Sequence, residues 1–240
     1  MPLRIAFDCD GVVADMDSAL AEIATRLFGD AEAKPATRAE PPAPEDAEAG
    51  QSGPADGPTA EEEAVEPDRI RALTRRQQHD IWEAVRRTEN FWETLPEAEP
   101  GAVARLAAVA RARRWEVIFI TQRPASGGDT TQVQTQRWLA AHGFDLPSVF
   151  VIHGSRGKVA DALSLDIVVD DRPQNCLDVK LESRARAILV WKGDFVDVPA
   201  NAVKLGIEPV AGIGSCLDML APAHPNRPGL VARLKQFIGR

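Results

Sequence analysis

The feature that most constrains the fold is a series of short, nearly uninterrupted apolar runs, separated by stretches in which apolar residues recur at helical spacing. Apolar runs without polar alternation are typical of strands buried on both faces, as in a parallel sheet covered by helices. Each interval is long enough for a crossover helix. The sequence therefore predicts an α/β protein with a doubly wound parallel sheet. The five predicted strands are residues 3–7, 117–120, 149–152, 165–169 and 187–190.

The interval between the first and second predicted strands is far longer than a crossover requires. It contains two amphipathic stretches, residues 16–28 and 68–87, which predict a small helical cap over residues 16–90. Residues 1–15 and 91–240 are predicted to form the α/β core. The other predicted helices cover residues 101–114, 130–142, 158–164 and 175–183, and an amphipathic helix with Leu230, Leu234, Phe237 and Ile238 is expected near the C-terminus.

The negative charge of the chain is concentrated in one part of the cap, residues 30–67. This segment has eleven acidic and two basic residues, seven prolines, ten alanines and a single large apolar residue, Val65. Since it cannot bury enough apolar surface to offset the entropy lost on ordering, it is predicted to be disordered. The rest of the chain has a net charge of +1. A broad basic surface for a nucleic acid polymer is therefore not indicated.

Composition and cysteine use restrict the class of protein further. With 44% hydrophobic and 27% charged residues in 240, the chain has material for a sizeable core. It contains no apolar run long enough to span a membrane, and acidic residues interrupt the first apolar stretch, so no secretion signal is expected. The three cysteines, Cys9, Cys176 and Cys216, have neither disulfide-framework nor zinc-site spacing. We expect a soluble, cytoplasmic protein that does not bind membranes.

Acidic residues follow two of the predicted strands at their carboxyl ends, where doubly wound sheets bind ligands. Asp8 and Asp10, two positions apart, share one side of the chain, and Gly11 then permits a sharp turn. Asp170 and Asp171 follow the fourth strand. Four carboxylates in one place repel one another unless a cation compensates them. An all-oxygen ligand set favours Mg²⁺, and the chemistry this implies is phosphoryl transfer.

These motifs, in this order, resemble those of the haloacid dehalogenase superfamily of phosphatases. Residues 5–12 (Ile-Ala-Phe-Asp-Cys-Asp-Gly-Val) match its first motif, and Thr121 after a second apolar strand matches its second. Lys158 matches the lysine of the third motif, and Asp170 with Asp171 the acidic pair of the fourth. The resemblance covers nearly the whole chain apart from residues 30–67 and the C-terminal tail. It implies a Rossmann-like core and a Mg²⁺-dependent phosphatase.

The resemblance also implies roles for individual residues. Asp8 would be the nucleophile that forms an aspartyl-phosphate, and Asp10 would protonate the leaving group and then activate water. Metal ligands would be Asp8, the Asp10 backbone carbonyl, and Asp170 or Asp171. An acid such as Asp10 is needed for an ester oxygen but not for a halide, which favours phosphate ester hydrolysis. The residues implied in phosphate binding are Thr121, Gln122 and Lys158.

A finer resemblance is to the 5'(3')-deoxyribonucleotidase branch, carried by residues 91–96, 138–143 and 170–175. That branch has a lysine ahead of the tryptophan of its middle helix, whereas residues 134–137 contain none, so Lys158 is predicted to take that role. The predicted substrate is a small phosphorylated metabolite, best a nucleoside or deoxynucleoside monophosphate. A sugar phosphatase or phosphomutase with the same chemistry, and a non-catalytic binding module, are the alternatives.

Four further residues are candidates for substrate contact. Arg123 and Arg172 follow motif residues and either contact substrate or pair with buried carboxylates. Phe91 and Trp92 lie where the cap rejoins the core and could stack on a base or sugar, although aromatic residues at such a hinge usually bury themselves. The sequence carries no signal for an oligomeric state or for the purpose of the acidic insert.

Overall fold

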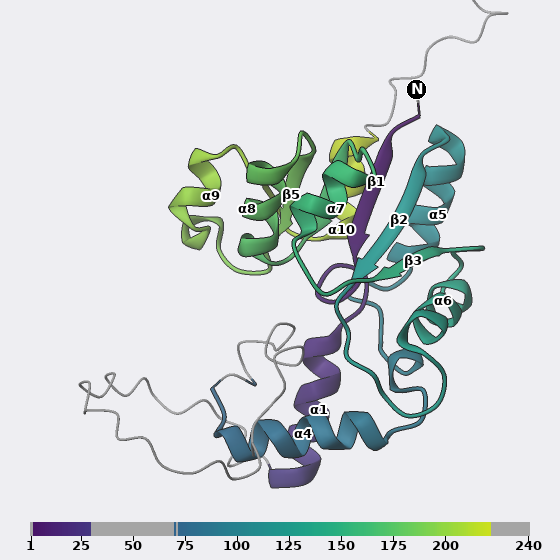
Figure 1. The fold of residues 1–240 in the computed structure, drawn as a ribbon, viewed down its shortest axis with the longest axis vertical. Helices are drawn as coiled ribbons and strands as arrows, with labels where there is room; N and C mark the ends of the chain where they lie inside the picture. The colour runs from purple at the N-terminus through teal and green to yellow at the C-terminus, as the bar shows by residue number, and fades with distance from the viewer. Residues whose placement is uncertain (1, 30–69, 71, 222–240) are drawn as a thin grey trace, which may run out of the picture.

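The sheet of this protein is fully parallel and has six strands. The computed structural model describes residues 2–29, 70 and 72–221, and its strand order is β3-β2-β1-β4-β5-β6 (Figure 1). This confirms the predicted α/β class, and all five predicted strands are present; β6 was not predicted because its three residues include a proline and carry no apolar run. The strands are β1 Arg4–Asp8, β2 Glu116–Thr121, β3 Ser148–Val151, β4 Ile167–Asp170, β5 Arg186–Val190 and β6 Glu208–Val210.

Helices cover both faces of the sheet, and successive strand residues serve opposite faces. In β1, Ile5 and Phe7 pack on the side of α5, α6 and α10, whereas Ala6 packs on the side of α7, α8 and α9. This explains why the strands are apolar throughout, since neither face meets solvent. The helices are α5 Ala102–Arg113, α6 Thr131–Ala141, α7 Arg156–Ala162, α8 Pro173–Glu182, α9 Ala200–Lys204 and α10 Ile213–Leu220.

Side-chain caps fix where several helices begin. Thr130 accepts a hydrogen bond from the Val133 backbone and starts α6. Ser155 accepts from Gly157 and Lys158 and starts α7, so this helix begins two residues earlier than predicted. Pro173 stands at the first turn of α8, where its missing N–H costs no hydrogen bond. The 3-10 turns η1 Phe91–Glu93 and η2 Phe195–Asp197 complete the connections.

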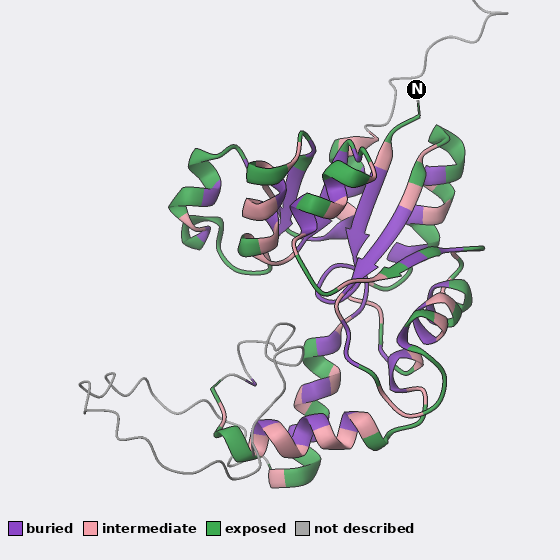
Figure 2. Ribbon diagram, in the orientation of Figure 1, coloured by how far each residue is buried: buried purple, intermediate pink, exposed green. Residues whose placement is uncertain are grey.

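Two helices extend beyond the carboxyl edge of the sheet and cross each other there (Figure 1): α1 Met16–Phe28 and α4 Arg75–Arg87. Their facing sides are buried, as the purple bands in Figure 2 show, through residues such as Leu20 and Trp82. The predicted helix over residues 68–87 is wrong at its start, because a capping box of Thr74 and Gln77 begins α4 at Arg75. The cap boundaries at 16 and 90 stay a prediction.

Two predictions fall outside the described residues: the disordered segment 30–67 and the terminal helix containing Leu230. In the part of the chain that the structure does describe, no helix is both long enough and apolar enough to cross a membrane.

Candidate functional site

The carboxyl ends of three adjacent strands bring the predicted site residues together. β1 lies between β2 and β4, so the strand order reverses here and the chain leaves the sheet in opposite directions. Asp8 ends β1, Thr121 ends β2 and Asp170 ends β4. All three are buried, and so is Asp10. The motifs predicted from sequence therefore converge on one edge, as their place after parallel strands requires.

The turn after β1 brings Asp171 against this cluster. Gly11 has a φ of 75°, and its N–H donates to the Ala14 carbonyl, while the N–H groups of Val13 and Ala14 both donate to Cys9. A Cβ atom at Gly11 would overlap the carboxylate of Asp171. Glycine is therefore required twice here, for its backbone conformation and for the close approach.

Asp8 and Asp170 share one buried guanidinium, that of Arg156. Arg156 Nη2 donates to Asp8 Oδ1 at 2.7 Å, and Nε donates to Asp170 Oδ2 at 3.4 Å. Burial raises the pKa of Asp8 well above its usual range, and the nearby Asp170 carboxylate raises it further, whereas Arg156 lowers it. Burial and Asp170 likewise raise the pKa of Asp171. Both carboxyl groups are therefore harder to ionise at this site than in water.

The predicted role of Lys158 beside Asp8 does not match the structure. Lys158 is exposed on α7, whereas Arg156, two positions earlier, reaches the carboxylates. The reason is the start of α7: Ser155 caps the N-terminus of this helix, so Arg156 occupies its first position and turns toward the strand ends. Arg156 Nη1 is buried without a hydrogen-bond partner within the described residues. Such a donor is costly unless a ligand or water oxygen accepts from it.

Asp170 is fixed by the start of α8. Its Oδ1 accepts from the Arg172 backbone N–H at 2.9 Å, and both of its oxygens lie 3.0 Å from Asn175 Nδ2. Arg172 thus holds this carboxylate through its backbone, and its side-chain charge lowers the pKa of Asp171. The half-buried Asp171 accordingly differs from the fully buried Asp170 in its access to a ligand.

Asp10 is bound by a second buried guanidinium. Arg123 Nε lies 3.0 and 2.9 Å from the two Asp10 oxygens, and Nη2 lies 2.8 Å from Oδ1. Of the two alternatives for Arg123, the structure therefore favours the partner of a buried carboxylate over substrate contact. Thr121 Oγ1 donates to Asp10 Oδ2 at 3.3 Å and is fully buried. Gln122, half-buried, follows it at the edge of the site.

The aromatic residues at the hinge pack inward. Phe91 and Trp92 are buried, and their rings meet edge to face with centroids 5.0 Å apart. Trp92 Nε1 donates to the Pro124 carbonyl at 2.9 Å. Their role here is packing, which was the favoured alternative for large aromatics at a hinge.

Sequence reasoning missed three contributors to the site. Arg156 follows Ser155, and recognising that serine as a helix cap would have placed the arginine at the start of α7. Asn175 lies on the first turn of α8, within reach of the preceding strand end. Lys192 follows β5 by two residues, and its charge lowers the pKa of Asp171. The signal for Lys192 is its place after the fifth apolar run, whose carboxyl end lies on the same edge of the sheet.

The charge balance tests whether the site fits a divalent metal. Burial, and after it the neighbouring Asp170 carboxylate, raises the pKa of Asp8 and of Asp171. A bound cation would favour the ionised forms of both carboxyl groups. Oxygen donors of this kind fit Mg²⁺. No three or more His, Cys, Asp or Glu side chains within residues 2–29, 70 and 72–221 already converge on one metal position. The residues that could hold the ion remain Asp8, Asp10 through its carbonyl, and Asp170 or Asp171.

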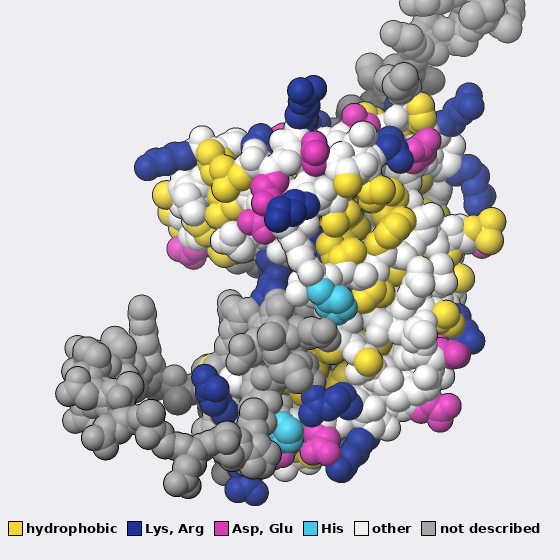
Figure 3. All heavy atoms as spheres, in the orientation of Figure 1, with side chains coloured by type: hydrophobic (Ala, Val, Ile, Leu, Met, Phe, Trp, Pro, Cys, Tyr) yellow, Lys and Arg dark blue, Asp and Glu magenta, His cyan; other side chains and the backbone are white. Residues whose placement is uncertain are grey.

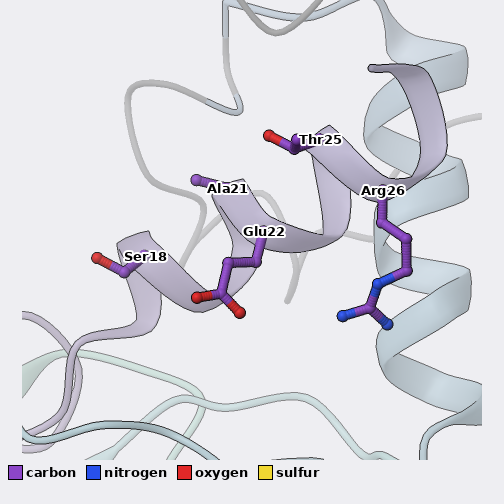
Figure 4. Close-up of a pocket in the computed structure, with 5 residues that line it drawn as sticks. All are labelled: Ser18, Ala21, Glu22, Thr25 and Arg26. Atoms are coloured by element: carbon purple, nitrogen blue, oxygen red, sulfur yellow. The ribbon is translucent and has the colours of Figure 1, made fainter. Parts of the chain in front are cut away.

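A separate surface hollow of about 510 Å³ lies along α1. Its lining comes from one side of this helix (Figure 4), and consists of Ser18, Ala21, Glu22, Thr25 and Arg26. The hollow contains one acidic and one basic side chain and does not include the carboxylates at the sheet edge. On the face of the molecule shown in Figure 3, acidic and basic side chains are likewise interspersed.

No family model and no curated protein matches this sequence. Among solved structures, a hydrolase from Pseudomonas syringae is similar with a TM-score of 0.50 and 14% identity, over 91% of this chain and 97% of that one. A putative beta-phosphoglucomutase from Thermotoga maritima has a TM-score of 0.48 and 18% identity over 91% and 98%. A 2-haloacid dehalogenase from Pseudomonas syringae pv. Tomato DC3000 has a TM-score of 0.45 and 14% identity, over 92% of this chain and 99% of that one. At such identities the likeness concerns the fold alone: the chain shares the α/β fold of the first of these, a hydrolase.

Proposed function

We propose that this chain is a Mg²⁺-dependent phosphatase of the haloacid dehalogenase type that hydrolyses a small phosphate monoester. The observation that carries the proposal is Asp8, buried at the end of β1 beside Asp170 and paired with Arg156, whose Nη1 has no hydrogen-bond partner in the described part of the chain. The similar fold of a structure described as a hydrolase, with a TM-score of 0.50, supports hydrolase chemistry. Three buried free cysteines suit a reducing, cytoplasmic compartment.

In the proposed reaction, an Asp8 carboxylate oxygen attacks phosphorus, and the bond from phosphorus to the ester oxygen breaks. This nucleophile must be ionised, and Arg156, 2.7 Å away, stabilises the ionised form against the effects of burial and Asp170. Arg156 Nη1 is a free donor for a phosphate oxygen. Arg156 would thus perform the charge-balancing role that the sequence assigned to Lys158.

Asp10 is proposed to transfer the protons of both steps. It gives a proton to the departing alkoxide, and it then takes one from the water that attacks phosphorus and releases Asp8. Asp8, the Asp10 carbonyl, and Asp170 or Asp171 would hold Mg²⁺. When bound, this ion would neutralise charge on the phosphate during transfer. Burial and the nearby carboxylates oppose ionisation of Asp8 and Asp171, and a bound divalent ion would offset this effect, which supports the proposal.

A nucleoside or deoxynucleoside monophosphate is the proposed substrate, on the sequence resemblance of residues 91–96 and 170–175. A sugar phosphatase or phosphomutase would use the same residues and is the alternative. Phosphatase and mutase differ in product, since a mutase moves phosphate between positions of a sugar and releases little of it.

The test is phosphate release from nucleoside monophosphates, sugar phosphates and an aryl phosphate, with and without Mg²⁺. The variant Asp8→Asn should lose all release, because the amide cannot form the acyl phosphate. Asp145→Asn, an exposed aspartate far from the sheet edge, is the matched control and should keep full activity. Release on nucleotides supports both the mechanism and the substrate, and release on sugars alone supports only the mechanism. Release by Asp8→Asn at the wild-type rate would refute the proposal.

A further inference from the structure

Arg123 is a buried cation whose hydrogen bonds all serve the interior of the site. Only 1% of its surface is exposed. Nε and Nη2 donate to Asp10, and Nη1 donates to Thr135 Oγ1 at 3.0 Å. A two-point contact between a planar guanidinium and a carboxylate fixes the plane of the carboxylate as well as its distance. The orientation of Asp10 is therefore set by Arg123.

The guanidinium is itself held from two other elements. Thr135 Oγ1 donates to the Thr131 carbonyl at 2.8 Å within α6, so its lone pairs are directed to Arg123. The guanidinium carbon lies 5.0 Å from the ring centre of Trp92, at cation–π distance. Trp92 is anchored in turn, because its backbone N–H donates to Gln134 Oε1 at 3.1 Å. Contacts with helix α6 and with the η1 turn therefore fix the position of the Arg123 guanidinium independently of Asp10.

We propose that Arg123 is a positioning residue, which holds the Asp10 carboxylate in the orientation required for proton transfer to the leaving group. The inference rests on the proposed function and adds to it a residue that touches no substrate. Without Arg123, Asp10 would stand among three other carboxylates with only the Thr121 hydroxyl, 3.3 Å away, to orient it. A lysine would keep the charge but would offer no planar fork.

The consequence depends on the leaving group. An alkyl phosphate releases a strongly basic alkoxide, which needs the proton from Asp10, whereas 4-nitrophenyl phosphate releases a stable phenolate, which does not. Proton transfer by a well-placed group contributes about 100-fold or more. Arg123→Lys should therefore lower kcat/KM on an alkyl phosphate by about 100-fold, and on the nitrophenyl ester by only a few-fold. The comparison uses kcat/KM because this ratio covers the steps up to departure of the leaving group, whereas kcat also includes the release of Asp8 by water, which needs Asp10 for either ester. An arginine with a purely structural role would affect both esters equally.

The experiment measures kcat and KM for both esters in full-length protein with Mg²⁺. Besides Arg123→Lys, it uses Thr135→Val, which keeps the guanidinium but removes its acceptor, and Thr135→Ser, which retains the hydroxyl. Thr135→Val should show the same selective loss to a smaller degree, and Thr135→Ser should restore the wild-type ratio of rates. The control is Arg137→Lys on the same helix, whose exposed guanidinium pairs with Glu93 and Asp129, and it should leave both rates unchanged.

Selective loss on the alkyl ester, in Arg123→Lys or, if that variant does not fold, in Thr135→Val, supports the inference. Parallel losses of kcat/KM on both esters, or unchanged kcat/KM in both variants, would overturn it while leaving the phosphatase itself established. Absence of hydrolysis by the wild-type protein on every ester would overturn the proposed function and this inference with it.

Discussion

The substitution Gly11→Ala tests the packing between the turn after β1 and the acidic pair. Gly11 has a φ of 75°, where an alanine costs about 1 kcal/mol through its backbone alone. Its added Cβ would also overlap the Asp171 carboxylate, and the Asp171 Cβ lies only 3.2 Å from the new atom, so rotation of the short side chain relieves only part of the overlap. Overpacking of this kind adds about 2 kcal/mol. The expected loss of stability is about 3 kcal/mol.

Gly101 offers a matched control for this prediction. Its φ is 76°, nearly that of Gly11, but an added Cβ there would have no neighbour within 4 Å. Gly101→Ala should therefore cost only the backbone contribution of about 1 kcal/mol. Urea unfolding of both variants and of the wild type, followed by circular dichroism, gives the two losses. Equal losses would refute the inferred contact between Gly11 and Asp171.

Two further predictions concern the charges of the site. Arg156→Met should lower the free energy of unfolding by about 3 kcal/mol, because it leaves buried Asp8 and Asp170 without their cation. The exposed Lys158 is the control, and Lys158→Met should change the free energy of unfolding by less than about 0.5 kcal/mol. Equal effects in urea unfolding would contradict the conclusion that Arg156, and not Lys158, compensates these carboxylates. Since the folded-state pKa of Asp171 is raised, its ionisation destabilises the fold as pH rises. Asp171→Asn should therefore stabilise the metal-free protein at pH 8 and lose this advantage toward pH 4; an advantage independent of pH would contradict the raised pKa.

The sheet was predictable because its signal is local. Each of the five predicted strands is a continuous apolar run, and such a short run is typical of a strand that is buried on both faces of a sheet. Strand β6 is short and contains Pro209, so it pairs only because β5 presents a free edge to it. That pairing depends on tertiary context, and no sequence pattern within residues 208–210 predicts a strand there.

The convergence of Asp8, Asp10, Thr121 and Asp170 was also predictable, because the ends of adjacent parallel strands share one edge. The cation that pairs with each carboxylate could not be predicted from the sequence. The choice between Arg156 and Lys158 depends on where α7 begins, and that depends on a single hydrogen-bonding side chain, Ser155. Helix starts shift by one or two residues for such reasons, and two residues turn a side chain by more than half a turn of the helix.

The two buried guanidinium groups bind different carboxylates of the site: Arg156 binds Asp8 and Asp170, and Arg123 binds Asp10. Arg156 contacts Asp8 and Asp170 at 2.7 and 3.4 Å, and its Nη1 has no hydrogen-bond partner among the described residues, so it retains a donor for an incoming anion. In Arg123, by contrast, each of the three nitrogens donates to Asp10 or Thr135. In the proposed reaction, an anionic substrate would therefore bind beside Asp8 through Arg156, while Arg123 holds Asp10 in place.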